Sequence, residues 1–159
     1  MVQETMASNP SLPAALGQSD HALLAHAIFH GRFRAAELML TLGFDPAAGG
    51  VDGGSALHAA CWMGHSGLVE RLIARGGLTL DARDPTHGST PLGWAAFGSV
   101  HRRAKGADYV AVIDRLVSAG ADVRAPGNGK GMTLLEMAAG NPAVQEALRR
   151  QGRVGGTAE

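Results

Sequence analysis

A pattern of small residues and periodic apolar residues that closes on a glycine occurs three times along this chain. The copies are residues 22–43, 55–76 and 90–120, and a weaker fourth copy starts at residue 133. Their equivalent positions Ala22, Ser55, Thr90 and Thr133 lie 33, 35 and 43 residues apart. Because one short helical unit cannot bury its apolar face alone, such repetition indicates units that stack on one another.

The second copy shows how one unit is expected to form. Residues 52–54, Asp-Gly-Gly, predict a turn, since glycine takes positive φ easily, and the Ser55 hydroxyl can cap the helix that follows. A second helix after Gly64 carries apolar residues at spacings of one, three and four, and Gly76 ends it. Each unit is therefore predicted to be helix, turn, helix.

Two of the copies also carry a recognisable motif. Residues 55–65, SALHAACWMGH, and residues 90–96, TPLGWAA, resemble the ankyrin signature T-P-L-H-x-A-A-x-x-G-H. The third copy, with its long connection after residue 99, looks like a variant found in bacterial ankyrin proteins. The resemblance implies an all-α ankyrin-repeat solenoid of about four helix-turn-helix repeats, joined by short β-turn or hairpin connections.

The repeat boundaries follow from this resemblance. We expect an ankyrin repeat domain over residues 20–152, with repeats at about 20–50, 51–84, 85–126 and 127–152. Residues 1–19 would form an N-terminal segment, either disordered or with one short helix around residues 12–16. Residues 153–159 would form a flexible tail.

Composition narrows the class of protein. The chain has 159 residues, which suits one domain, and 14 basic residues balance 14 acidic ones. Zero net charge gives no general attraction to nucleic acid or to an anionic membrane. The single cysteine excludes an internal disulfide, no apolar run is long enough to span a membrane, and the first residues lack a signal-peptide pattern. We expect a soluble cytoplasmic protein without a cofactor.

The resemblance also implies a function, because ankyrin domains mostly bind proteins through the concave face. In the family pattern two variable, solvent-facing positions follow the paired small residues; here they hold Phe29 and His30, Trp62 and Met63, Phe97 and Gly98, and Gly140 and Asn141. Aromatic residues and methionine are enriched in interface cores, so these positions predict an apolar binding stripe. The alternative is that the aromatic rings only pack on one another.

Flanking contacts are predicted at two other places. The expected insertion, residues 100–108, carries three fixed positive charges, Arg102, Arg103 and Lys105, which suit an acidic partner or a phosphate, or simply face water. It has no interleaved aromatic residues to stack bases, which disfavours nucleic acid. His87 lies at a turn tip, and Trp94 is expected to be partly buried between repeats.

A metal site is the alternative that the histidines suggest. His26 and His30 are four residues apart and share a helix face, but the stretch between them lacks the His-Glu-x-x-His pattern, and Cys61 has no second cysteine. His58 and His65 match positions that are structural in the family. The second hypothesis is thus a small-molecule or metal-binding accessory domain of an enzyme system, using the aromatic residues with His26 or His30.

Catalytic motifs are incomplete. Residues 64–67 are one residue short of G-x-S-x-G, and residues 127–131 lack the Ser or Thr that follows the lysine of a phosphate-binding loop. Asp81 and Asp84 are expected in an exposed turn between repeats, where nothing tunes a carboxylate for acid-base work. We expect no catalysis, a protein partner, and a monomer or a weak homodimer.

Overall fold

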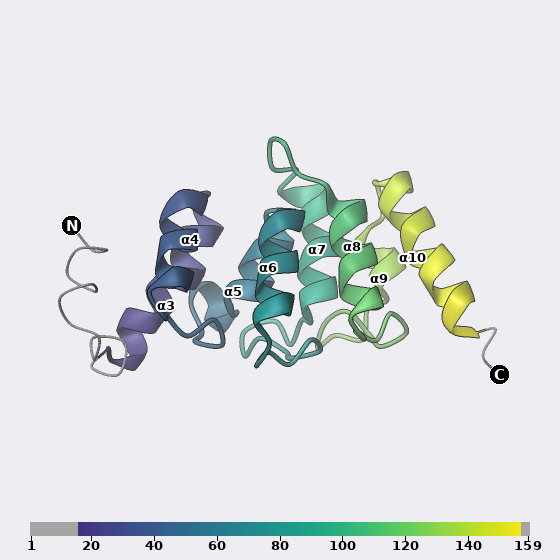
Figure 1. The fold of residues 1–159 in the computed structure, drawn as a ribbon. Coiled ribbons are helices and arrows are strands. Elements are labelled where there is room, and N and C mark those ends of the chain that lie inside the picture. The colour runs from purple at the N-terminus through teal and green to yellow at the C-terminus, as the bar shows by residue number, and fades with distance from the viewer. Residues whose placement is uncertain (1–15, 157–159) are drawn as a thin grey trace.

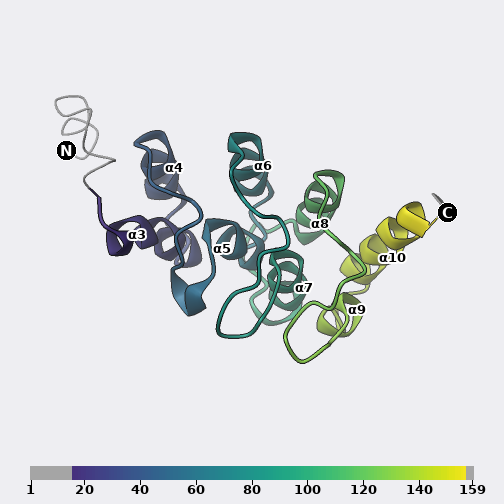
Figure 2. The same ribbon diagram turned by 90° about the horizontal axis from the view of Figure 1, so that it is seen from below.

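The computed structural model describes residues 16–156 and contains two rows of helices (Figure 1). The first row holds α3 (Gln18–Phe29), α5 (Ala56–Trp62), α7 (Pro91–His101) and α9 (Leu134–Met137). The second row holds α4 (Phe33–Thr41), α6 (Ser66–Arg75), α8 (Tyr109–Ser118) and α10 (Pro142–Gly156), and a 3-10 turn, η1 (Val51–Gly53), precedes α5. Figure 2 shows the two rows side by side. The predicted all-α solenoid of four stacked helix-turn-helix repeats is confirmed.

Local sequence explains where the first helices begin. The side chains of Ser55, Thr90 and Thr133 each accept a hydrogen bond from the backbone N–H three residues further on, which caps α5, α7 and α9. Gly64, in the turn between α5 and α6, has φ +62°, a conformation that glycine adopts without strain. The second, third and fourth repeats therefore begin their first helices at the predicted positions, whereas α3 begins at Gln18, before the predicted equivalent position Ala22.

The core lies between the two rows and continues through all four repeats. α5 packs between α3 and α7, and α8 packs between α6 and α10. Its largest fully buried side chains are Leu24, Ile28, Leu57, Leu68, Leu72, Leu92, Ile113, Leu116, His58, Val69, Val112 and Val144. Because the apolar residues of one repeat are covered by the next, the chain behaves as one continuous stack.

Two glycines of α7 let neighbouring segments approach its backbone closely. A Cβ at Gly98 would lie 2.7 Å from the Trp62 carbonyl oxygen, so the backbones of α5 and α7 nearly touch there. A Cβ at Gly93 would lie even closer to the carbonyl oxygen of Gly127. Gly93 replaces the signature histidine, and its lack of a side chain makes room for the loop that precedes α9.

Several boundaries differ from the sequence-based expectation. α7 continues through His101, so the projecting loop is residues 102–108 and not 100–108. α10 continues through Gly156, beyond residue 152 where the repeat domain was expected to end. The long connections contain no strand within residues 16–156 and are held by turns. The helix expected around residues 12–16 lies almost wholly outside the described residues.

No helix in residues 16–156 combines the length and the apolar character that crossing a membrane requires.

Candidate functional site

Three aromatic rings form a row across the first helices of three repeats. Phe29, Trp62 and Phe97 end or lie near the end of α3, α5 and α7, and we call them the ring row. The ring centroids of Phe29 and Trp62 are 6.0 Å apart with the planes 3° from parallel, and those of Trp62 and Phe97 are 6.2 Å apart at 23°. Imidazole rings extend the row at both ends: His30 meets Phe29 edge-on, and His101 lies 4.0 Å from Phe97.

The ring row is neither fully exposed nor fully buried. Phe97 is 41% exposed, whereas Phe29 and Trp62 are half-buried and pack against the core. The near-parallel rings stack on one another at these separations, and Phe97 still leaves part of its surface to solvent. Stacking among the rings, which the sequence offered as the alternative to binding, thus coexists with an open apolar surface.

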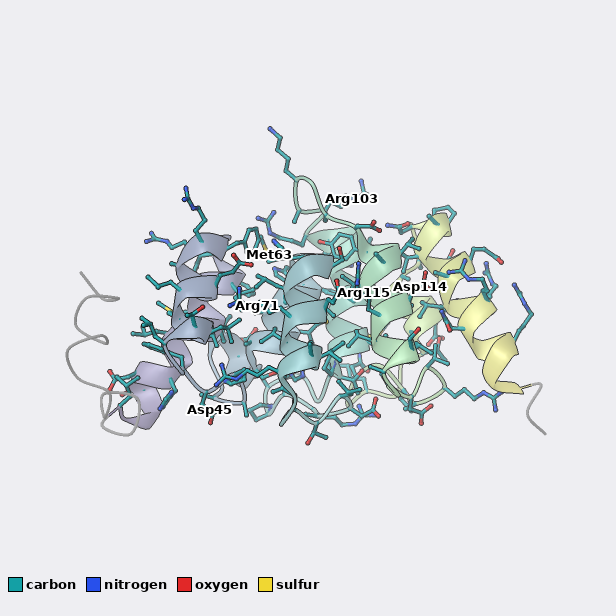
Figure 3. The ribbon with its side chains drawn as sticks, in the orientation of Figure 1. Asp45, Met63, Arg71, Arg103, Asp114 and Arg115 are labelled. Atoms are coloured by element: carbon teal, nitrogen blue, oxygen red, sulfur yellow. The ribbon has the colours of Figure 1, made fainter. Side chains whose placement is uncertain are left out.

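Met63 is not part of this surface, and its predicted exposed position is wrong. The side chain is only 5% exposed. Its backbone N–H donates a hydrogen bond to the Ala59 carbonyl oxygen at the end of α5, and its methyl group lies near Gly31 of the first repeat. Figure 3 shows Met63 between α4 and α6. The side chain fills the gap between two repeats, because the turn after α5 directs it inward.

The ring row opens into a groove of about 620 Å³. One side of the groove is formed by the ring row and the other by the loops that precede α5, α7 and α9. The lining residues are Phe29, Asp52, Trp62, Thr86, His87, Gly88, Ser89, Gly93, Trp94, Phe97, Asn128, Gly129, Lys130, Met132 and Met137. The walls are mostly apolar, and the polar groups come from the loops, an arrangement typical of ligand-binding grooves.

Trp94 and Asp84 hold the loop side of the groove in place. Trp94 is 7% exposed, as its expected structural role requires, but Asp84 is 1% exposed, so the expectation of an exposed turn is wrong for it. The Asp84 carboxylate accepts hydrogen bonds from the Thr86, His87 and Ser89 amides and from the Trp94 indole N–H. Burial alone would raise the pKa of Asp84, but these four donors together outweigh it and hold the pKa below its usual value.

His58 has the structural role that its signature position implies. Its Nδ1 accepts a hydrogen bond from the Ser55 amide at 3.1 Å, so the ring proton is on Nε2, which lies 2.9 Å from the Ala82 carbonyl oxygen and 3.1 Å from that of Ser89. The ring thereby joins the second repeat to the loop of the third. Burial lowers the pKa of His58, and its carbonyl partners and Asp84 offset part of that effect.

The remaining predicted contact residues lie around the groove. His87 is exposed on the groove wall, where its Nε2 is 3.2 Å from Asp52 Oδ2. His30 is exposed at the far end of the ring row. Arg102, Arg103 and Lys105 are exposed in the loop after α7 and do not line the groove. The structure therefore brings Phe29, Trp62, Phe97 and His87 into one groove, whereas the three cations lie outside it.

The chemistry of a metal or nucleophilic site finds no support in the described residues. Within residues 16–156 no three His, Cys, Asp or Glu side chains gather in a way that could hold a metal ion. His26 and His30 are both exposed. Cys61 is completely buried, which raises the pKa of its thiol far above its usual value and keeps it protonated.

The sequence reasoning missed the contribution of the fourth repeat. Met132, Met137 and Lys130 line the groove from the loop before α9 and from α9 itself. Asp84 was missed as well, although Asp-Pro-Thr-His-Gly, residues 84–88, is a sequence in which the aspartate side chain can bond the amides that follow it. That turn signal was available before the structure.

Comparison with known proteins agrees with this geometry. Residues 52–85 match the family model of the ankyrin repeat. Protein PhlB of Serratia liquefaciens is 36% identical over 76 residues, which are 48% of this chain and 33% of that protein. The matched stretch thus spans about a third of the length of this relative.

Proposed function

We propose that this chain, whose residues 52–85 match the ankyrin repeat, is a non-catalytic scaffold that binds another protein through the groove lined by the ring row. Ankyrin repeats generally mediate protein–protein interactions. The groove supplies what such an interface needs, an apolar centre with polar groups at the rim. We place the protein in the cytoplasm, as a monomer or a weak homodimer.

One observation carries the proposal. Phe97 leaves 41% of its surface in water and lines a mostly apolar groove together with Phe29 and Trp62. Exposed aromatic side chains at the centre of a concave apolar surface are typical anchors for a partner. The buried titratable groups nearby, Asp84 and His58, use their hydrogen-bonding atoms within the fold, which favours binding over catalysis.

The experiment compares two exposed apolar side chains. Leu23, on α3, is 49% exposed and lies outside the groove, so Leu23→Ala is a matched control for Phe97→Ala. Each tagged variant is used to retain proteins from lysate of the source organism, and the affinity of the purified retained protein is then measured by calorimetry. We expect Phe97→Ala to weaken binding about tenfold or more while its thermal melt stays near that of the native protein.

Leu23→Ala should bind as the native protein does. Equal affinity of Phe97→Ala and the native protein would contradict the proposed site. If the protein retains only a second copy of itself, and Phe97→Ala abolishes this retention, the groove mediates homodimerisation and does not bind a different protein.

A further inference from the structure

We propose that the partner is a protein segment rich in Asp and Glu, which places an apolar side chain on the ring row and its carboxylates on the loop after α7. We call residues 102–106 the cationic loop. The inference rests on the proposed function and adds the chemical class of the partner. Three properties of the cationic loop support it: its cations, which form no ion pair within residues 16–156, the hydrogen bonds that hold it, and its position next to the ring row.

The cations of the loop lack partners within the part of the chain that the structure describes. Arg102, Arg103 and Lys105 are exposed, and none of them makes an ion pair or a side-chain hydrogen bond with a residue in 16–156. Arginines of the second row do make ion pairs, which are Arg71–Glu37, Arg115–Glu70, Arg150–Asp114 and Arg153–Glu146. Carboxylates thus accompany these four arginines of the second row but not the cations of the cationic loop.

The first repeat adds two cations at the equivalent connection. Arg32 and Arg34 follow the connection between α3 and α4, the first-repeat equivalent of the connection that holds the cationic loop. Both are exposed and likewise make no ion pair with a described residue. In Figure 3 Arg103 lies at the upper edge, where the two helices of each repeat connect, and Asp45 lies at the opposite edge. A chain with no net charge therefore has one locally cationic edge.

The loop is anchored rather than free. The Tyr109 hydroxyl donates to the carbonyl oxygen of Trp62 at 2.8 Å and accepts from the Ala104 amide at 3.2 Å. The Asp108 amide donates to the carbonyl oxygen of Gly64 at 2.9 Å. These bonds hold the loop on the end of α5, at the residue that supplies the middle ring of the row. Its cations are thereby preorganised, which reduces the entropy that binding must overcome.

Arg103 itself has an unusual backbone. Its φ is +45°, in the left-handed region that favours glycine and asparagine. Glycine would be less strained at this position, so the local backbone conformation does not favour an arginine there. Strained residues that persist concentrate at binding and catalytic sites.

Contact between His101 and Phe97 joins the loop to the ring row. The two rings lie 4.0 Å apart, and Arg102 directly follows His101 at the end of α7. An extended segment lying across Phe97 therefore meets the cationic loop within a few residues. Guanidinium groups bind carboxylates through paired hydrogen bonds, so acidic residues flanking an apolar one fit this surface.

The ring geometry favours a protein over nucleic acid. Single-stranded nucleic acids bind by stacking bases on aromatic faces. In the ring row the near-parallel rings already stack on one another, so fewer free faces remain for bases, whereas an apolar side chain can pack on any part of a ring. A membrane is disfavoured as well, because stable attachment to lipid needs apolar residues that insert, and residues 102–106 contain only one small one, Ala104.

The test uses a phage-displayed library of random 12-residue peptides, selected on the intact native protein at about 50 mM salt, where charges are weakly screened. We expect selected peptides to combine Asp or Glu with Trp, Phe, Leu or Met. Affinity of one selected peptide is then measured for Arg103→Glu/Lys105→Glu and for the control Arg149→Glu/Arg153→Glu, which changes the charge equally on α10. The first variant should bind about tenfold or more weakly, and the control within about twofold of the native protein.

Four results would overturn the inference. Selected peptides without acidic enrichment, or equal binding by the cationic-loop variant, would leave the proposed function standing and remove the acidic partner, provided that Phe97→Ala still weakens binding. If no peptide is selected but oligo(dT) or phosphatidylserine vesicles bind in a charge-dependent way, the ligand is a nucleic acid or an anionic membrane and not a protein segment. Selection of no peptide, with no such binding, would end both proposals. If circular dichroism shows that Arg103→Glu/Lys105→Glu does not fold, Lys105→Glu alone is used in its place.

Discussion

The indole nitrogen of Trp94 donates a hydrogen bond to Oδ2 of Asp84 across 2.8 Å, and both side chains are buried. The bond joins the first helix of the third repeat to the loop that precedes it. Because the same carboxylate also accepts from three backbone amides, the loop side of the groove depends on one side chain. The hydrogen bonds that shape this side of the groove therefore also stabilise the fold.

We predict that Asp84→Ala lowers the free energy of unfolding by about 3 kcal/mol or more, because four donors lose their acceptor and two of them, in Ser89 and Trp94, are buried. Urea denaturation measures the change. Asp45→Ala is the control, since Asp45 is exposed and its carboxylate accepts one hydrogen bond, from the Ala47 amide. A loss of less than about 1 kcal/mol for Asp84→Ala would contradict the role given to this carboxylate.

We predict a pH dependence of stability that comes from His58. Its pKa is lowered in the folded protein, so the unfolded chain takes up the proton at a higher pH. The stabilisation is fully present above the unfolded pKa of about 6.5 and decreases as the pH falls through that value toward the lower folded pKa. Protonation of Nδ1 would also set a proton against the Ser55 amide that it now accepts from.

The measurement is urea denaturation of the native protein and of His58→Gln at several pH values from 8 down to 5. The variant should be less stable throughout but should show a smaller decrease on acidification. An identical decrease in both proteins would assign the pH dependence to another group.

We predict opposite effects of the same substitution at two helical glycines. Gly98→Ala should destabilise the protein by about 2 kcal/mol or more, because the new Cβ would lie 2.7 Å from the Trp62 carbonyl oxygen and push α5 and α7 apart. Gly152→Ala, on α10, meets no atom within 4 Å and should stabilise by up to about 1 kcal/mol through helix propensity. Thermal melts followed by circular dichroism distinguish the two. Neutral behaviour of Gly98→Ala would show that the repeats separate without cost.

We predict that Tyr109→Phe frees the cationic loop without unfolding the domain. The variant loses the hydrogen bonds to the Trp62 carbonyl and the Ala104 amide, at a cost of about 1 to 2 kcal/mol. Hydrogen exchange should be faster at residues 102–106 and unchanged in α3 and α4. Unchanged exchange in the loop would mean that the backbone hydrogen bonds of Arg102, Arg103 and Asp108 are enough to anchor it.

We predict that Trp62→Ala costs about 1 to 2 kcal/mol, less than the 3 to 5 kcal/mol of a fully buried tryptophan, because Trp62 is only half-buried. In a double-mutant cycle with Phe97→Ala, the coupling free energy of the two rings should be about 0.5 to 1.5 kcal/mol. Urea denaturation of the four proteins gives this value. A coupling near zero would show that the rings are adjacent without interacting.

The repeat architecture could be predicted from the sequence because its causes are local. The capping residues Ser55, Thr90 and Thr133 and the turn glycine Gly64 act on amides and dihedral angles a few residues away. The alignment of Phe29, Trp62 and Phe97 followed from the same register, because equivalent positions of stacked repeats must lie side by side.

What each side chain contacts was decided by the tertiary structure. Met63 and Asp84 were both expected in water, yet both are buried, because packing of neighbouring repeats and the fold of the loop turn them inward. The contribution of Met132 and Lys130 to the groove depends on how the loop before α9 approaches α7. The sequence by itself therefore determined the repeating frame and the aromatic positions, while only the packing of one repeat on the next decided which side chains stay exposed, since exposure depends on residues distant in the chain.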